Sequence, residues 1–421
     1  MIAEGSVVPP GDKSLTHRAL LLGSVAQGTS AIAGALTSLD TRSMAGALQA
    51  LGSTISPLRP DRVVTVRGRG VRGLQAPAAS LDCGNSGTAA RFLLGLTSAY
   101  PFRTRITGDD SLRRRPMRRV TTPLKLMGAG FQEENGDGLP LVVEGGTLQP
   151  LYYDSPAASA QVKGALMFAG LAAGVPVRIR EPVRSRDHTE RMLRALGATV
   201  ESHGNEVRLV PPASIPAFEL RVPADPSSAA FLVAAALLAE SGELEIRGVC
   251  VNPTRIGFLQ VLERMGAGVV VSPTGEALGE PVASLTVRPT RLQGTEVLPG
   301  EVPSLIDEIP ILAVLASRAE GTSVFRGVEE LRVKESDRLG LLASNLRAVG
   351  VAAEATSDTL QVQGTDAAPH GTVETARDHR LAMAFAVLNT VPRAAIILSE
   401  TASVAVSYPG FFEQLEMVLH R

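Results

Sequence analysis

Two carboxylates with basic neighbours are the first candidates for chemistry in this sequence. In ELRVKESDRL, which begins at Glu330, the acid Glu335 stands between Lys334 and Arg338. A carboxylate between cations stays ionised, unless burial or an anionic ligand raises its pKa toward the range of a general acid or base. Asp307 opens the apolar run DEIPILAVL, so the sequence predicts either a helix-capping residue or a general base. The simpler interpretation of ELRVKESDRL is a charged surface loop.

A second set of candidates is basic or hydrogen-bonding and lies where apolar helices are predicted to begin. A helix N-terminus has unpaired N–H groups and about half a positive charge, so several such ends together would bind a multiply charged anion. For Ser227 and Ser228 we favour simple helix capping. Arginine adds positive charge to a positive pole, so for Arg91 and Arg380 we expect an anionic ligand or a carboxylate partner. The set comprises Lys13, Ser14, His17, Arg18, Asn85, Ser86, Gly87, Thr88, Arg91, Ser159, Gln161, Lys163, His379 and Arg380.

The use of basic residues gives two further indications. Arginine is the default cation of this chain, and the four lysines kept against that bias are weak pointers to function: Lys13, Lys125, Lys163 and Lys334. The segment SLRRRPMRR, residues 111–119, is predicted to form mostly a solvated face. Arg115, which precedes Pro116, is expected on the loop side of its unit.

The helices that would position these residues recur at a regular interval. Six Ala- and Gly-rich apolar runs begin 68 to 80 residues apart, which indicates an internal structural repeat. Because the runs are apolar nearly all round, we expect helices that are buried on every side. Their first residues are Ser14, Ser86, Ser159, Ser227, Asp307 and Asp378.

Most repeats are predicted to add a second helix, and strands lie between the helices. Alternating runs such as RTRITG, VRIREP and TSVFRG are typical of half-buried strands. The second helix ends at a glycine suited to the left-handed position after a helix, followed by a β-rich run. These glycines are Gly52, Gly128, Gly197, Gly266 and Gly350. The predicted fold class is therefore α/β, with helices inside and sheets outside.

Two proline-bearing segments divide the six repeats into two groups of three. VVPPG at residues 7–11 and VPADPSS at residues 222–228 each stand just before a repeat begins. The predicted N-terminal lobe comprises residues 12–223, and the predicted C-terminal lobe comprises residues 1–11 and 224–421. A chain of 421 residues can bury a core in each lobe, so we expect a stable monomer.

Composition excludes several other classes of protein. The formal net charge of −1 favours neither nucleic acid nor an anionic membrane. The two cysteines, Cys83 and Cys250, form no CxxC pair, so neither a disulfide scaffold nor a structural zinc site is expected. No signal-peptide pattern and no apolar run of about 18 residues is present. We therefore expect a cytoplasmic protein with no membrane or nucleic-acid partner.

Six segments together resemble the 5-enolpyruvylshikimate-3-phosphate synthase family, in the branch often called class II. They extend from residue 9 to about residue 390 and read PGDKSLTHRALLLGS, CGNSGTAARFL, SAQVKGALMFAG, SRDHTERML, ELRVKESDRL and DHRLAMAFAV. The resemblance implies transfer of the enolpyruvyl group of phosphoenolpyruvate to the 5-hydroxyl of shikimate 3-phosphate, with release of phosphate, in the pathway to aromatic amino acids. It implies no metal and no organic cofactor. It also implies a two-domain inside-out α/β barrel of six βαβαββ repeats, three per domain, that closes over the two substrates.

The resemblance also assigns substrate-binding roles, motif by motif. Shikimate 3-phosphate would be held by Lys13, Ser14, Arg18, Ser159, Ala160, Gln161, Ser185 and Arg186. Phosphoenolpyruvate would be held by Lys13, Gly87, Thr88, Arg115, Arg338 and Arg380, and Asp307 and Lys334 would also bind substrate. Guanidinium groups suit the phosphate and carboxylate of phosphoenolpyruvate because they bind such anions in a bidentate way.

Catalysis would fall to two carboxylates and one lysine. The resemblance implies that Asp307 accepts the proton of the substrate hydroxyl. Glu335, helped by Lys13, would protonate the methylene carbon, and the roles would reverse for elimination. Two carboxylates in different surroundings can divide the proton transfers of an addition–elimination reaction in this way.

The sequence departs from the family at two places. Many relatives carry a lysine shortly before the last aromatic-proline turn, whereas none stands near Val406, so one phosphate contact is missing or is supplied elsewhere. Phe92 stands where some relatives have proline. Gly87 is retained, so the methyl group that blocks the inhibitor glyphosate in some tolerant relatives is absent, and sensitivity to glyphosate stays open.

Two alternatives remain. The related UDP-N-acetylglucosamine enolpyruvyl transferases share the implied fold but use a loop cysteine, and neither Cys83 nor Cys250 lies in the RRRP loop where it is expected. Both cysteines suit buried structural positions better. The other alternative is a non-catalytic repeat protein that binds an anionic metabolite. Against it stand Asp307 and Glu335, because pure anion binding gains nothing from carboxylates.

Overall fold

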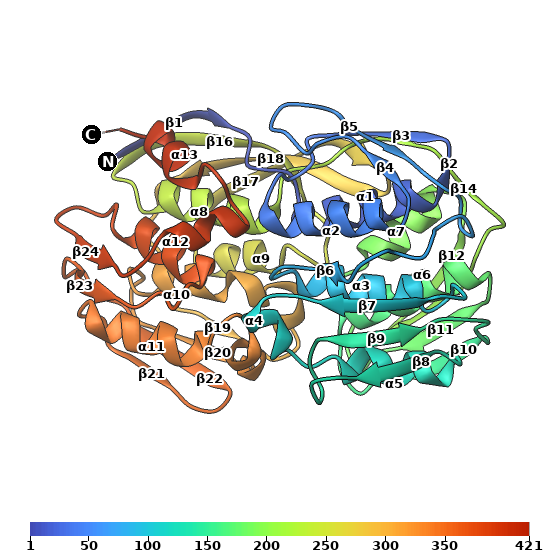
Figure 1. The fold of residues 1–421 in the computed structure, drawn as a ribbon. Coiled ribbons are helices and arrows are strands. Elements are labelled where there is room, and N and C mark those ends of the chain that lie inside the picture. Colours follow the sequence, from blue (N-terminus) through green and yellow to red (C-terminus); the bar gives the residue numbers. More distant parts are fainter. Residues whose placement is uncertain (421) are drawn as a thin grey trace. The chain divides into compact units, whose positions relative to one another are not determined.

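The computed structural model describes residues 1–420, which fold into two compact units (Figure 1). The N-terminal unit comprises Gly11–Val222 and Glu276–Glu280, and the C-terminal unit comprises Met1–Pro10, Pro223–Gly275 and the chain from Pro281 onward. The assignment of a functional lobe to residues 12–223, and of another to the remainder, stays a prediction. None of the helices in residues 1–420 combines the length and the apolar character that a membrane span requires.

The N-terminal unit contains helices α1 to α7 and strands β2 to β15. The helices are α1 (Lys13–Val25), α2 (Leu39–Ala50), α3 (Gly87–Thr97), α4 (Asp110–Arg113), α5 (Arg118–Leu126), α6 (Ala160–Ala173) and α7 (His188–Ala195). The strands are β2 (Ala26–Gln27), β3 (Thr29–Ala33), β4 (Thr54–Ile55), β5 (Val64–Arg67), β6 (Leu81–Asp82), β7 (Arg103–Thr107), β8 (Gly130–Glu133), β9 (Leu141–Glu144), β10 (Leu151–Asp154), β11 (Val177–Arg180), β12 (Thr199–His203), β13 (Glu206–Val210), β14 (Ile215–Pro216) and β15 (Glu219–Arg221).

The C-terminal unit contains the remaining elements. Its α-helices are α8 (Pro226–Leu237), α9 (Gly257–Arg264), α10 (Ile309–Ala316), α11 (Arg338–Ala348), α12 (His379–Leu388) and α13 (Phe411–Val418). Short 3₁₀ turns are η1 (Val302–Ser304), η2 (Ile306–Glu308), η3 (Glu329–Val333) and η4 (Ala402–Val406). Its strands are β1 (Ile2–Val7), β16 (Ser241–Cys250), β17 (Gly268–Ala277), β18 (Glu280–Arg288), β19 (Glu296–Val297), β20 (Thr322–Arg326), β21 (Ala353–Ala355), β22 (Thr359–Gln363), β23 (His370–Val373), β24 (Ala395–Leu398) and β25 (Leu419–His420).

The sheets repeat one strand order, which confirms the α/β fold built from repeats. Within residues 1–420, four sheets have the orders β15-β3-β5-β4, β6-β7-β9-β8, β10-β11-β13-β12 and β19-β20-β22-β21. In each, the first two strands are parallel and the others are antiparallel. A parallel pair needs a long crossover, so in three of these repeats an apolar helix lies between the two paired strands: α3, α6 and α10.

The fourth and sixth repeats deviate from this order. The fourth has the sheet β17-β18-β16-β1-β25, in which β1 and β16 are parallel. The sixth keeps only the parallel pair β23 and β24 around α12, and its last strand, β25, pairs with Ile2 and Ala3 of β1 instead. The two ends of the described chain therefore meet in one sheet.

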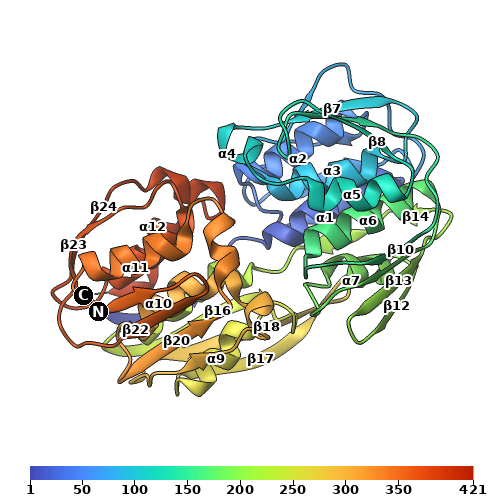
Figure 2. The same cartoon turned by 90° about the horizontal axis from the view of Figure 1, so that it is seen from below.

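One helix of each repeat lies in the centre of its unit, as the apolar runs predict. In the N-terminal unit α3 packs against both α1 and α6, and in the C-terminal unit α8, α10 and α12 pack against one another (Figures 1 and 2). Every residue of α8, α10 and α12 is buried. The strands alternate buried and exposed residues, for example along β11, so one face of the sheet covers the helices.

The helix ends confirm one prediction and correct another. All five glycines that follow the second helices have positive φ angles between 76° and 107°, as the left-handed position requires. Ser227 and Ser228, however, do not cap α8. Asp12 caps α1 and Asp225 caps α8, each accepting a hydrogen bond from a backbone N–H at 2.8 Å. An aspartate satisfies the N–H groups as a serine does and adds a favourable charge at the positive pole.

Gly95 allows α3 and α6 to pack in direct backbone contact. A Cβ atom at Gly95 would lie 2.0 Å from the carbonyl oxygen of Ala165 in α6. Because the obstacle is backbone, no rotation of a side chain can relieve it. Gly46 in α2 is a helical glycine of the same unit where an added Cβ would meet no atom within 4 Å.

We predict that Gly95→Ala destabilises the protein by about 1–3 kcal/mol, the usual cost of overpacking a core. The matched change Gly46→Ala is expected to stabilise it by about 0.5–1 kcal/mol, because alanine loses less backbone entropy than glycine in a helix. Urea unfolding followed by circular dichroism measures both changes. Equal midpoints for the two variants would show that the close contact at Gly95 does not constrain the core.

Candidate active site

The first cluster of predicted residues lies in the C-terminal unit and is centred on Asp307. Asp307 is in η2, and Glu308 occupies the N-cap position of α10, so the helix-capping alternative for Asp307 is wrong. Four basic side chains surround the Asp307 carboxylate at 3.8 to 4.0 Å; they belong to Arg255, Lys334, Arg338 and Arg380. Their attraction stabilises the ionised form of a carboxylate whose side chain is only 15% exposed.

Arg338 connects Glu335 to a third carboxylate. Its Nη2 group donates to Oε2 of Glu335 at 2.5 Å, and its Nε group donates to Oδ2 of Asp378 at 2.8 Å. Asp378 also accepts from the backbone N–H of Arg380, which makes it the N-cap of α12. The same carboxylate therefore starts one helix and holds the first residue of another, α11.

Burial and charge act in opposite directions on this pair. Burial acts to lower the pKa of Arg338, but the carboxylates of Asp378 and Glu335 outweigh it and raise the pKa above its ordinary value. Burial acts to raise the pKa of Asp378, but the Arg338 guanidinium outweighs it and holds the pKa below 3.8. Both groups are therefore charged at neutral pH, in a site where neither side chain is more than 1% exposed.

Arg380 explains why charge stands before an apolar helix in DHRLAMAFAV. Its Nη1 group donates to the backbone oxygen of Asp307 at 3.0 Å, and its Nη2 group lies 3.9 Å from the Asp307 carboxylate. A carboxylate partner, one of the two expected, is thus present. The five residues to which the resemblance assigns roles in this unit meet in one cluster: Asp307, Lys334, Glu335, Arg338 and Arg380.

In the N-terminal unit, Gln161 connects the beginnings of α3 and α6. Its amide nitrogen donates to Oγ1 of Thr88 at 2.9 Å, and its amide oxygen accepts from Nη1 of Arg91 at 2.6 Å. A Cβ atom at Gly87 would lie 2.8 Å from the same Arg91 nitrogen, so a larger residue there would displace the guanidinium.

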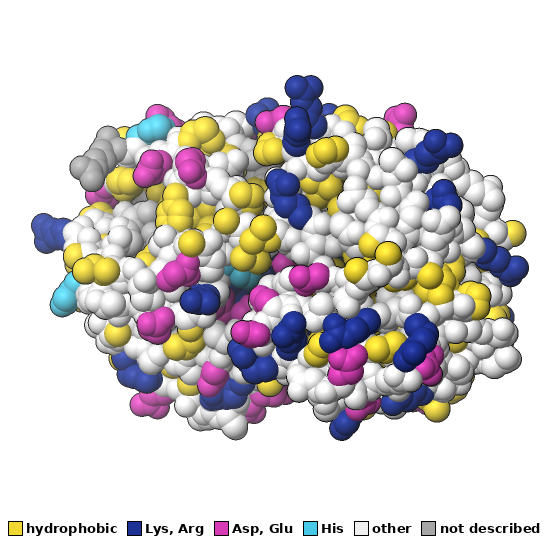
Figure 3. Space-filling model, viewed as in Figure 1, with side chains coloured by type: hydrophobic (Ala, Val, Ile, Leu, Met, Phe, Trp, Pro, Cys, Tyr) yellow, Lys and Arg dark blue, Asp and Glu magenta, His cyan; other side chains and the backbone are white. Residues whose placement is uncertain are grey.

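Arg115 belongs to the same group. Its Nη2 group donates to the side-chain oxygen of Asn85 at 2.6 Å, and its Nη1 group would lie 3.4 Å from a Cβ atom at Gly87. The other arginines of the 111–119 segment are exposed. Figure 3 shows basic and acidic side chains mixed over the region of α4 and α5, which confirms a solvated face.

Arg18 is buried at the start of α1 and is held by three contacts. Its Nε group donates to Oγ1 of Thr189 at 2.8 Å, its Nη1 group donates to the backbone oxygen of Ser14 at 2.9 Å, and its guanidinium carbon lies 4.8 Å from the Phe92 ring centre. Phe92 thus provides a cation–π surface. Burial, together with the nearby Arg186, lowers the pKa of Arg18 to about 10, so it is still charged at neutral pH.

His17 and Lys13 flank this position. Burial, then the charges of Lys13 and Arg18, lower the pKa of His17 to about 3. His17 is therefore neutral, and its Nε2 atom lies 3.5 Å from Oγ of Ser86, which is a scaffolding contact. Lys13 donates to Oδ2 of Asp40 at 3.3 Å.

Ser159 and Ser185 are joined by a carboxylate that sequence reasoning missed. Ser159 caps α6, whose first residue is Ala160, and its backbone N–H donates to Glu181 at 2.8 Å. The Ser185 hydroxyl donates to the same Glu181 side chain at 2.8 Å. The only signal in the sequence was indirect: Lys163, one of the four lysines, pairs with Glu181 at 2.9 Å.

Two more residues of the clusters were also missed. Arg255, in the NPTR segment, is 2% exposed and reaches both Asp307 and Ser227. Asp40 reaches Lys13 from the start of α2. Neither follows a pattern that periodicity reveals, because each meets its partner only through tertiary packing.

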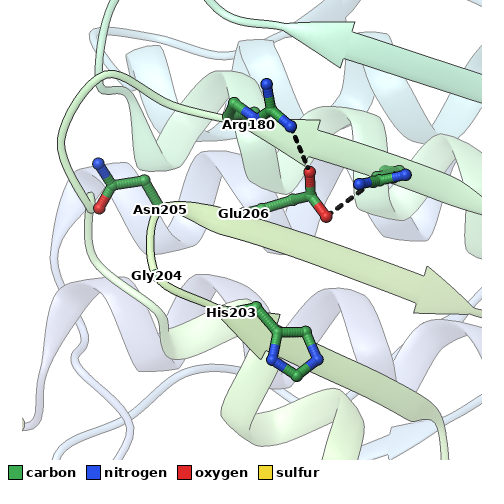
Figure 4. A pocket seen from close by; sticks show the side chains of 6 residues that line it. Arg180, His203, Gly204, Asn205 and Glu206 are labelled. Atoms are coloured by element: carbon green, nitrogen blue, oxygen red, sulfur yellow. Dashed lines mark hydrogen bonds and ion pairs between the residues drawn. The ribbon is translucent and has the colours of Figure 1, made fainter.

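A depression beside β11 and β13 is lined by Arg178, Arg180, His203, Gly204, Asn205 and Glu206, and Glu206 pairs there with both arginines (Figure 4). None of the predicted site residues lines it. Within residues 1–420, no three His, Cys, Asp or Glu side chains are grouped so that they could hold a metal ion.

Solved structures of known proteins share this fold. The enolpyruvyl transferase NikO from Streptomyces tendae superposes with a TM-score of 0.77 over 99% of this chain and 95% of its own, at 18% identity, which shows the fold alone. EPSP synthase from Acinetobacter baumannii superposes with a TM-score of 0.89 at 38% identity, over 99% of this chain and 96% of its own. The class is therefore that of the enolpyruvyl transferase fold.

Sequence comparison identifies the family within that class. The family model for EPSP synthase (3-phosphoshikimate 1-carboxyvinyltransferase) matches residues 3–415. Proteins named 3-phosphoshikimate 1-carboxyvinyltransferase are 44% identical in Geobacter sulfurreducens, over 99% of this chain and 97% of theirs, and 42% identical in Bacillus cytotoxicus, over 98% and 97%. The chain belongs to the EPSP synthase family of enzymes, which confirms the resemblance and favours neither alternative.

We predict that Asp378→Asn destabilises the protein by about 3 kcal/mol at neutral pH, which is the low end of the cost of breaking a buried ion pair. The low end applies because Arg338 still has its second ion pair, with Glu335. The folded-state pKa of Asp378 is depressed, so this stabilisation is complete above about pH 5 and is lost as the pH falls through that pKa. Urea unfolding of both proteins at a series of pH values should show the gap closing on the acid side.

The control for this prediction is Asp337→Asn, at the residue directly before Arg338. Asp337 caps α11, and its side chain is 51% exposed. Asparagine caps nearly as well, so we expect a change below about 1 kcal/mol. A gap for Asp378→Asn that does not depend on pH would contradict an ionised, paired Asp378.

Proposed function

We propose that this protein transfers the enolpyruvyl group of phosphoenolpyruvate to the 5-hydroxyl of shikimate 3-phosphate, giving 5-enolpyruvylshikimate 3-phosphate and phosphate. The observation that carries the proposal is the Asp307 cluster, where two carboxylates stand among cations within 4.0 Å. Family membership supports the same reaction, because the relatives are named for it.

The substrates are anions, and the two clusters offer cations and hydrogen-bond donors of matching kind. In the N-terminal unit, Lys13, Arg18 and Arg186 supply positive charge, and Ser14, Ser159, Gln161 and Ser185 supply hydrogen-bonding groups for shikimate 3-phosphate. Ala160 keeps the start of α6 small. For phosphoenolpyruvate the proposed groups are Gly87, Thr88, Arg115, Lys334, Arg338 and Arg380. The guanidinium groups of the three arginines in this set can each bind a carboxylate or a phosphate by paired hydrogen bonds.

The reaction has an addition step and an elimination step, and each step needs one proton to be removed and another to be delivered. In the addition step, Asp307 takes the proton of the 5-hydroxyl group of shikimate 3-phosphate. The oxygen of that hydroxyl group then bonds to C2 of phosphoenolpyruvate. Glu335, with Lys13, delivers a proton to C3, which becomes a methyl group. In the elimination step Glu335 takes a proton from that methyl group, the C2–O bond to phosphate breaks, Asp307 returns its proton to the departing phosphate, and the double bond between C2 and C3 forms again.

The two carboxylates differ in surroundings in a way that fits these roles. Asp307 lies among four cations, whereas Glu335 is 27% exposed and contacts Arg338. Preorganised cations lower the free energy of a transition state that gathers negative charge. We further propose a cytoplasmic monomer that uses no cofactor; the deeply buried Cys83, whose pKa burial raises, suits a structural rather than a reactive thiol.

Purified protein is expected to release inorganic phosphate only when phosphoenolpyruvate and shikimate 3-phosphate are both present, since phosphate leaves only from their adduct. A colorimetric phosphate assay measures this, with each substrate alone as the control. Release of phosphate with UDP-N-acetylglucosamine in place of shikimate 3-phosphate would instead identify the protein as a UDP-N-acetylglucosamine enolpyruvyl transferase. No release with either acceptor would leave the non-catalytic anion-binding protein as the better description.

Replacing Glu335 tests its proposed catalytic role. Glu335→Gln should reduce kcat by roughly 10² or more, the scale of lost acid–base catalysis, while the Kd values of both substrates change little. The matched control is Glu329→Gln, which neutralises an exposed glutamate six residues earlier in η3 and should leave kcat unchanged. If Glu335→Gln weakened binding but kept kcat, Glu335 would be a binding residue only.

A further inference from the structure

Glu181 is the common hydrogen-bond partner of two serines assigned to shikimate 3-phosphate. Its Oε1 atom accepts from the backbone N–H of Ser159 at 2.8 Å. Its Oε2 atom accepts from the Ser185 hydroxyl at 2.8 Å and from the Ser185 N–H at 3.3 Å. Glu181 directly follows β11, so one carboxylate fixes both the start of α6 and the loop before α7.

Lys163 and Glu190 complete a buried cluster around this carboxylate. The Lys163 ammonium lies 2.9 Å from Glu181 and 2.8 Å from Glu190, and all three side chains are at most 4% exposed. Burial acts to lower the pKa of Lys163, but Glu190 and Glu181 outweigh it and raise the pKa above its ordinary value. Buried charges of this kind persist because they are paired and hydrogen-bonded.

The cluster contains more negative charge than the lysine needs. One carboxylate neutralises Lys163, and a second one near an anion-binding site opposes binding through Coulomb repulsion. The two glutamates differ in their other contacts. The charge of Glu190 acts on Arg18, where it partly offsets the burial that lowers the Arg18 pKa, whereas Glu181 holds the two serines. The second carboxylate is therefore explained by the serines and not by the lysine.

We propose that Glu181 is a positioning residue for shikimate 3-phosphate, which it serves through Ser159 and Ser185, and that the Lys163 ammonium holds the Glu181 carboxylate in place. This inference rests on the proposed function. Ser159 uses an oxygen lone pair to accept from the Val162 N–H, which leaves its hydroxyl hydrogen available to donate to the substrate phosphate. When the phosphate binds, the Ser185 hydroxyl turns from Glu181 to the anion, while the Ser185 N–H and Lys163 remain on Glu181.

The test compares Glu181→Gln with Glu190→Gln. Each variant removes one of the two carboxylates of Lys163, so the loss of charge and the burial are matched. If the two glutamates acted only through their negative charge, both variants would have a lower KM for shikimate 3-phosphate. Positioning predicts that KM for shikimate 3-phosphate rises about tenfold or more in Glu181→Gln only, the effect of losing hydrogen bonds to a charged group, while KM for phosphoenolpyruvate changes less than about twofold.

Two further variants separate positioning from folding. Glu181→Asp keeps the charge beside Lys163 but is one methylene shorter, so it cannot reach both serines, and the same rise in KM is expected. In a cycle with Ser185→Ala, the combined effect of Glu181→Gln and Ser185→Ala on KM should be smaller than the product of the single effects, because one acts through the other. Urea unfolding of each variant identifies any that fail to fold.

The outcomes distinguish this inference from the proposed function. Equal KM values for Glu181→Gln and Glu190→Gln, or single effects that multiply in the double variant, would overturn the positioning role and leave the reaction intact. Calorimetry gives the Kd of shikimate 3-phosphate for the same proteins independently of turnover. A wild-type protein that binds it but releases no phosphate would refute the reaction alone, and one that does not bind it would refute both.

Discussion

The neutralisation of positive charge at buried helix N-termini is the constraint on which the rest of this structure depends. The beginning of an α-helix is already a positive pole, and a buried cation placed there has little stability without a nearby carboxylate or an anionic ligand. Arg338, the first residue of α11, is fully buried and is held by Asp378 and Glu335. Lys163 in the first turn of α6 is held in the same way by Glu181 and Glu190.

The distances of these ion pairs suggest a division between support and binding. Arg338 and Lys163 make pairs of 2.5 to 2.9 Å, which are short enough to be charge-assisted hydrogen bonds. The cations around Asp307 lie 3.8 to 4.0 Å away, farther than such a bond. An incoming anion can therefore compete for Lys334 and Arg380, whereas Arg338, although it also lies 4.0 Å from Asp307, is held at the start of α11 by its two short pairs.

The fold was predictable because its causes are local and repeated. Helical burial follows from runs such as SSAAFLVAAALL, which has no polar face to expose, and the positive φ angles follow from the glycine after each second helix. The cap of α8 was mispredicted because serine and aspartate are equally good caps, and the choice between Asp225 and Ser227 depends on where the chain enters the helix.

The amino-acid sequence by itself determined the repeat, the α/β class, the family and most of the residues that now form the two clusters. Only the tertiary structure decided that Asp307 faces cations instead of capping a helix, and that Glu181 joins Ser159 to Ser185. The reason is the range of the interactions. Helical and strand periods arise within a few residues, but Arg338 meets Asp378 across 40 positions and Arg18 meets Thr189 across 171, and only the packed helices bring such partners together.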